Sequence, residues 1–148
     1  MKAITLAVAL ALLMAVSYAW TPFRFETQHD MLEYMRDEDH NIYVIFFYNS
    51  GQENRADSER MRQIVIQERE AIRKNVLEAF DNIVYAELDL AGGHYDEAAH
   101  EIGIETADTL EYPTVVAVDD GIGKWVHGPD LSQLLVPTVK ALILRNQN

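Results

Sequence analysis

The chain has 148 residues, of which 49% are apolar, so it is long enough for one domain with a buried core. Its 24 acidic and 12 basic residues give a net charge of −12, which repels the phosphates of nucleic acids and argues against nucleic acid as a partner. The sequence contains no cysteine, and this excludes disulfide bonds, thiolate catalysis and metal sites that cysteine ligates.

The first residues have the pattern of a secretory signal peptide. Lys2 precedes an apolar run over residues 3–16, and the small residues Ser17 and Ala19 stand at the −3 and −1 positions of a cleavage site after Ala19. We therefore expect residues 1–19 to be removed and the protein to reach the secretory lumen or the outside of the cell.

The alternative is that the apolar run stays in place as an N-terminal membrane anchor. Residues 3–20 are slightly short of the ~20 apolar residues that a spanning helix needs, although aromatic residues beside them could extend the span. In that case the protein touches a membrane only through residues 3–20, and an organellar inner membrane is one such location. In both cases we expect residues 20–148 to form one domain.

The domain begins with a helix and a strand. Thr27 is placed to cap a first helix, and the acidic residues 37–39 end it. Residues 42–48 are β-branched or aromatic without polar alternation, which predicts a central strand buried on both faces.

Two more helices and a strand follow. Apolar side chains recur at helical spacing over residues 56–80, which predicts a long amphipathic helix, either straight or kinked. Residues 83–88 predict the next strand, and a shorter helix over residues 95–101 follows the pair Gly92 and Gly93. This alternation of strands and helices implies a parallel sheet covered by helices.

In the last part of the chain, two predicted strands follow each other without a helix between them. Residues 114–118 and 124–126 predict two short strands, and the glycine-containing link over residues 119–123 predicts a hairpin. Asp130 or Ser132 is placed to cap a final helix.

Pro137 lies within the early turns of that final helix and is the weak point of its assignment. With the final helix included, the order after the first helix is β-α-β-α-β-β-α.

This order resembles the thioredoxin superfamily over residues 23–145, with a long helix directly after the central strand and the step Tyr112-Pro113-Thr114 before the hairpin. The resemblance implies an α/β fold of the thioredoxin-like type, a central mixed β-sheet flanked by helices. Family members carry Cys-x-x-Cys at the start of the long helix, where the helix dipole lowers the pKa of a thiol. Residues 51–54 occupy that place here, and none of their side chains can exchange a disulfide. The resemblance therefore implies a redox-inactive member.

A second departure agrees with the first. The buried acidic residue that serves proton transfer in the family is absent, because Ile45 stands at its expected place. Asn49 or Ser50 can still cap the long helix, and Glu53 is a favourable anion at its start, so the turn keeps its structural chemistry.

The resemblance also implies where a protein partner binds. In the family the proline before the hairpin is cis and its loop faces the redox turn, so we expect Pro113 to be cis. We expect no catalytic residue, cofactor or metal ligand. The predicted partner-binding surface combines the two loops, namely Asn49, Ser50, Gly51, Gln52, Glu53, Asn54, Glu111, Tyr112 and Pro113.

Other polar clusters have simpler interpretations. The histidine and acidic residues within residues 94–101 match no common metal-site spacing and are typical of a solvated helix. The acidic runs at residues 37–39 and 119–120 could bind Ca²⁺ weakly, but they lack the ligand spacing of an EF-hand, and solubility explains them better.

Three functions follow from these patterns. The first is a non-catalytic protein-binding or scaffolding module without disulfide oxidoreductase activity. The second is an accessory subunit of a larger membrane complex, tethered through residues 3–20. The third and weakest is a cysteine-independent enzyme of the glutathione-transferase or peroxidase kind, for which only Ser50 is suitably placed.

Overall fold

The structure is a computed structural model that describes residues 21–51 and 58–147. Its helices and strands follow the predicted order, with one short helical turn, η2, in addition. No helix in these two ranges is long and apolar enough to span a bilayer. The elements are α2 (Gln28–Arg36), β1 (Ile42–Tyr48), α3 (Ser58–Ile72), η1 (Arg73–Leu77), β2 (Ile83–Asp89), α4 (Asp96–Glu101), η2 (Asp108–Leu110), β3 (Thr114–Asp119), β4 (Ile122–His127) and α5 (Leu131–Asn146).

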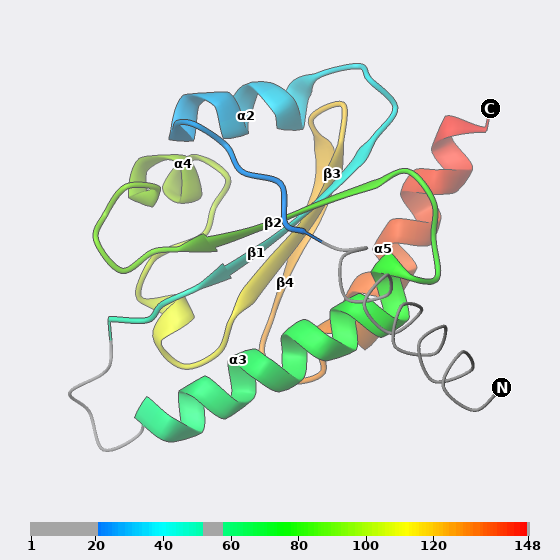
Figure 1. Ribbon diagram of the computed structural model, residues 1–148. Helices are drawn as coiled ribbons and strands as arrows, with labels where there is room; N and C mark the ends of the chain where they lie inside the picture. Colours follow the sequence, from blue (N-terminus) through cyan, green and yellow to red (C-terminus); the bar gives the residue numbers. More distant parts are fainter. Residues whose placement is uncertain (1–20, 52–57, 148) are drawn as a thin grey trace, which may run out of the picture.

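The four strands form one mixed sheet in the order β2-β1-β3-β4. Strand β1 runs parallel to β2 and antiparallel to β3, and β3 and β4 form an antiparallel hairpin. Figure 1 shows α2 and α4 on one face of the sheet and α3 and α5 on the other. The predicted architecture, a mixed central sheet flanked by helices, is confirmed.

Strand β1 lies at the centre of two apolar cores. Its residues 42–47 are all buried, as the unbroken apolar run predicts. Val44 and Phe46 pack with the α3 and α5 side chains, whereas Ile45 and Phe47 pack with those of α2 and α4. The alternation of a strand therefore gives each helical layer its own half of the core.

The first helix is capped as predicted. The backbone N–H of Asp30 donates to the Thr27 hydroxyl at 3.1 Å, and the backbone N–H of Thr27 donates to the Asp30 carboxylate at 2.9 Å. This reciprocal pair is a capping box, and it satisfies two donors at the start of α2.

The predicted long helix over residues 56–80 is observed as α3 followed by η1, while residues 56 and 57 lie outside the described ranges. The helical turns change from α to π at Arg73. The helical turns end at Leu77, so the prediction ran a few residues too far.

The hairpin link is shorter than the sequence predicted. Asp119, Ile122 and Gly123 belong to the strands, and only Asp120 and Gly121 form the turn. Both turn residues have positive φ, 50° and 67°. Positive φ at both positions is what a two-residue type I′ turn requires, and the twist of this turn matches that of the flanking strands.

Of the two predicted alternatives, Asp130 occupies the N-cap position of α5, and Ser132 lies inside the helix. Asp130 has a left-handed backbone and its side chain makes no capping hydrogen bond. Instead, the two carboxylate oxygens of Glu68 on α3 each accept one backbone N–H, from Asp130 and from Leu131, both at 3.0 Å. A carboxylate at a helix N-terminus is favoured by the unpaired N–H groups there, so α3 caps its neighbour in space.

Gly123 tests the packing of the hairpin. A Cβ atom at this position would lie 2.2 Å from the Ala117 carbonyl oxygen, which is fixed in the neighbouring strand. We expect Gly123→Ala to lower the free energy of unfolding by about 1–3 kcal/mol. The measurement is urea denaturation, with Ile122→Ala as the control because Ile122 is 55% exposed. Equal stability of the two variants would contradict the close approach of β3 and β4.

Candidate functional site

The two loops of the predicted site leave the sheet at the same end. Phe47, near the end of β1, pairs with Thr114, the first residue of the antiparallel strand β3. The chain after Tyr48 and the chain before Thr114 therefore start from neighbouring positions. The turn η2 lies against β1, and Figure 1 shows it beneath that end of the strand.

Six of the nine predicted site residues are described, namely Asn49, Ser50, Gly51, Glu111, Tyr112 and Pro113. The other three, Gln52, Glu53 and Asn54, lie outside the described residues. The strand register brings the six to one end of the sheet in two groups of three.

The turn after β1 is held by the end of β2. The backbone N–H of Ser50 donates to Asp89 at 3.0 Å, and the Ser50 hydroxyl donates to the other oxygen of the same carboxylate. The backbone N–H of Ala91 also donates to Asp89, at 2.9 Å. Asp89 thus ties together the segments that follow β1 and β2.

The side chains of Asn49 and Ser50 are used within this turn. Asn49 is buried, and its amide oxygen accepts the backbone N–H of Gly51 at 2.9 Å. Both side chains therefore hold the turn, and the start of the long helix that they were predicted to cap lies outside the described residues.

Solvent exposure decreases along the segment before β3: Glu111 is exposed, Tyr112 is half-buried and Pro113 is buried. The Tyr112 ring packs edge-on against His127 with 6.3 Å between ring centroids. His127 is in turn 2.9 Å from the Thr114 hydroxyl through Nδ1.

The expected cis bond at Pro113 is wrong. No peptide bond between described residues is cis, so the Tyr112–Pro113 bond is trans. Trans is the lower-energy form for a residue followed by proline, and the local preference prevails here over the resemblance.

A groove of about 280 Å³ lies beside this end of the sheet, between β1 and α3. Tyr48 lines it from the end of β1, and Asn49 and Ser50 line it from the turn that follows. Met61, Val65 and Arg69 are among the residues that line it from α3. Sequence reasoning missed the α3 side, because charged and apolar residues that recur at helical spacing are typical of an ordinary amphipathic helix. The helical spacing of residues 62, 66 and 69 was the signal that could have found it.

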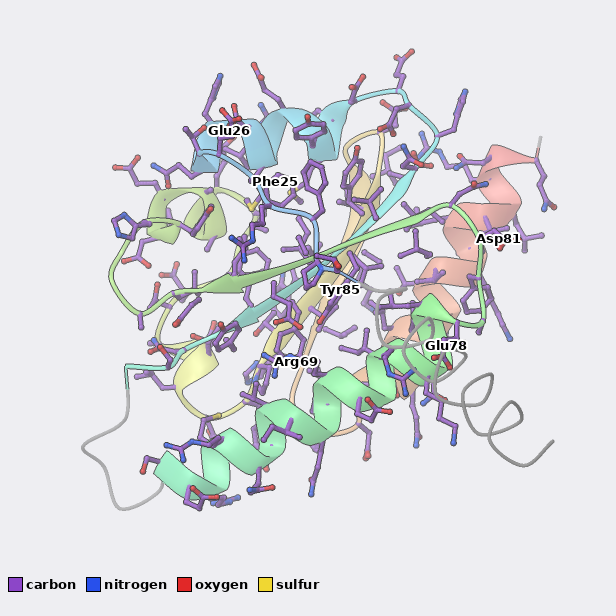
Figure 2. The ribbon with its side chains drawn as sticks, in the orientation of Figure 1. Phe25, Glu26, Arg69, Glu78, Asp81 and Tyr85 are labelled. Carbon is purple, nitrogen blue, oxygen red and sulfur yellow. The ribbon has the colours of Figure 1, made fainter. Side chains whose placement is uncertain are left out.

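Arg69 closes one end of the groove. Its Nε donates to the Glu87 carboxylate at 2.7 Å, and its guanidinium lies 5.8 Å from the Tyr48 ring centroid and 6.0 Å from that of Phe46. Figure 2 shows Arg69 extending from α3 toward the sheet. Partial burial opposes the charge of Arg69, but the hydrogen bond and the charge of Glu87 outweigh it and raise the pKa of the guanidinium.

Tyr85 completes the contacts of Glu87. Its hydroxyl donates to the same carboxylate oxygen at 2.8 Å. Burial, together with the Glu87 charge, raises the pKa of the Tyr85 hydroxyl. Tyr85 therefore stays neutral and serves as a hydrogen-bond donor that helps to position Glu87 under Arg69.

The polar side chains of residues 96–100 interact with other side chains of the protein. Asp96 accepts the Thr106 hydroxyl, Glu97 accepts the Gln28 amide and His100 contacts Glu105. Within residues 21–51 and 58–147, no group of three or more histidine or acidic side chains is arranged to hold a metal ion.

The topology decides the fold type. A parallel pair β1 and β2 is extended by an antiparallel hairpin, with two helices on each face, in the order predicted from the resemblance. The fold is thioredoxin-like. This thioredoxin-like chain has no cysteine in its whole sequence, so the turn after β1 carries no redox pair.

Several solved structures are similar to this chain. Among solved structures, a designed protein is 21% identical, with 83% of this chain and 93% of that chain covered and a TM-score of 0.50. Thioredoxin from Fasciola hepatica is 19% identical, with coverages of 77% and 93% and a TM-score of 0.49. A mutant thioredoxin from Entamoeba histolytica is also 19% identical, with coverages of 82% and 99% and a TM-score of 0.47. No family model matches the sequence, and no curated protein matches it.

Asp89 provides a test of how the site is held. We expect Asp89→Ala to lower the free energy of unfolding by about 1.5–3 kcal/mol, because three donors lose a charged acceptor. Ser50→Ala removes only the hydroxyl donor and is expected to cost about 1 kcal/mol. The exposed Asp81, at the opposite end of β2, is the matched control as Asp81→Ala. Additive effects of Asp89→Ala and Ser50→Ala in a double-mutant cycle would contradict their coupling.

Proposed function

We propose that this protein is a non-catalytic module that binds a segment of a partner protein at the loop end of its sheet. The absence of cysteine supports the non-catalytic part, because disulfide exchange requires a thiolate that forms a mixed disulfide with the substrate. The proposed surface consists of Asn49, Ser50, Gly51, Glu111, Tyr112 and Pro113.

The observation that carries this proposal is the pairing of Phe47 with Thr114. It brings a turn stabilised by Asp89 beside a segment that contains a partly exposed tyrosine. Tyrosine is among the residue types that contribute most to binding at interfaces. A pre-ordered turn beside such an anchor lowers the entropy lost on binding, which favours recognition of a partner segment.

Tyr112→Ala tests the proposal. We expect this variant to retain the partner about tenfold less well or worse, because truncation of a central aromatic anchor removes much of the binding energy. The measurement is affinity capture from secretory and membrane fractions, with the captured proteins quantified by mass spectrometry. Thermal unfolding of the variant should stay close to that of the wild type.

The control is Ile122→Ala, which removes an apolar side chain with 55% exposure beside the turn at the opposite end of β3 and β4. A partner that is lost with Ile122→Ala and retained with Tyr112→Ala would place the binding surface elsewhere and contradict the proposal.

We also propose that the chain enters the secretory pathway, on the strength of the apolar run at residues 3–16. N-terminal sequencing of the protein isolated from its source is expected to give Trp20 as the first residue. A chain that still begins at Met1 in a membrane fraction would favour the alternative, a tethered accessory subunit of a membrane complex.

A further inference from the structure

The groove between β1 and α3 has an apolar floor. Met61 and Val65 are 9% and 8% exposed, and Tyr48 lines the groove with them. Ile66 lies at the rim of the groove and is 48% exposed, which is high for a large apolar side chain. The volume of about 280 Å³ accommodates one or two amino-acid side chains. The floor and rim thus fit an apolar side chain from another molecule.

Arginines stand beside this apolar surface. Arg69 donates a hydrogen bond to Glu87, so its side chain is held in place as a wall of the groove. Within the part of the chain that the structure describes, Arg62 at the rim forms an ion pair with Glu59 alone, at 3.2 Å. Both side chains are more than 60% exposed. A surface pair of this kind contributes little to stability. Arg62 can therefore exchange Glu59 for a carboxylate of a ligand without loss of structure.

The charge around the groove differs from that of the rest of the chain. The chain has a net charge of −12, yet six of its 12 basic residues lie within residues 55–74. The same stretch holds four acidic residues, so its net charge is +2 while the rest of the chain has a net charge of −14. The charged residues that line the groove are Arg62 and Arg69, and no acidic residue is among its described lining residues. An acidic ligand is therefore repelled less at the groove than by the rest of the chain. The position of the arginines thus selects for acidic ligands.

We propose that this groove binds an extended segment of a partner protein in which an apolar side chain and an acidic side chain are close neighbours. The apolar side chain packs on Tyr48, Met61 and Val65, and the carboxylate pairs with Arg62. This inference rests on the proposed function, because Asn49 and Ser50 belong both to the groove and to the loop site. It adds the chemical class of the segment that is bound.

A random library of twelve-residue peptides displayed on phage tests the inference against the full chain. The wild type is expected to enrich peptides with Asp or Glu within two positions of Leu, Ile, Met or Phe. Arg62→Gln is expected to bind the enriched peptides about tenfold more weakly, since a charge-assisted hydrogen bond is lost. Ile66→Ser should weaken them as well. Arg60→Gln is the matched control, because Arg60 lies on the same helix, is exposed and does not line the groove.

The possible outcomes separate the two proposals. Enrichment of basic peptides, or equal effects of Arg62→Gln and Arg60→Gln, would overturn the inference. The enriched peptides could bind Tyr112→Ala more weakly than the wild type and bind Arg62→Gln as tightly as the wild type. This result would support the proposed loop site and contradict the proposed preference of the groove for acidic segments. If the wild type enriches no peptide, both proposals fail.

Discussion

Burial of β1 on both of its faces is the constraint on which the other elements depend. An unbroken apolar strand must be covered by helices above and below, because every second side chain points to the opposite face. Val44 and Phe46 require α3 and α5, whereas Ile45 and Phe47 require α2 and α4. Both neighbouring strands then take their register from β1, and the pairing of Phe47 with Thr114 places the two candidate loops together.

The turn after β1 shows how this fold can keep a shaped loop without redox chemistry. Asp89 accepts donors from Ser50 and Ala91, and Asn49 accepts the N–H of Gly51. These hydrogen bonds fix the conformation of the turn, and none of them requires a cysteine. Beside this turn, Arg69 is held over two aromatic rings by Glu87, which gives the adjoining groove a rigid wall. The described part of the turn, residues 49–51, and this wall of the groove are therefore held in place by hydrogen bonds within the chain.

The sequence predicted the elements best where one residue pattern determines them. Residues 42–48 were assigned without error because no polar residue interrupts the run. Thr27 was predicted as a cap from its position before the first helix, and the structure pairs it with Asp30, only three residues away. The length of the hairpin link was overestimated, since the tight turn depends on positive φ at Asp120 as well as at Gly121. Local patterns thus sufficed for local structure.

Features that depend on contacts distant in sequence could not be read in this way. Glu68 caps a helix that begins 63 residues later, and no local pattern identifies it as the acceptor. The same limit applies to the site. The predicted order of the elements was enough to identify both loops. The groove, in contrast, is lined by Tyr48 from β1 and by Val65 from α3, and only the packed structure shows that these two residues lie beside the same cavity. The trans bond at Pro113 shows that a resemblance of fold does not extend to every backbone detail.

The central claim, that the loop end of the sheet is the binding surface, is tested most directly by amide hydrogen exchange. The full chain is compared alone and in complex with the partner that the wild type captures. The account predicts slower exchange on binding in residues 49–51, residues 111–114 and the first turns of α3. Slower exchange confined to α2, α4 or α5, with the loop end unchanged, would contradict it.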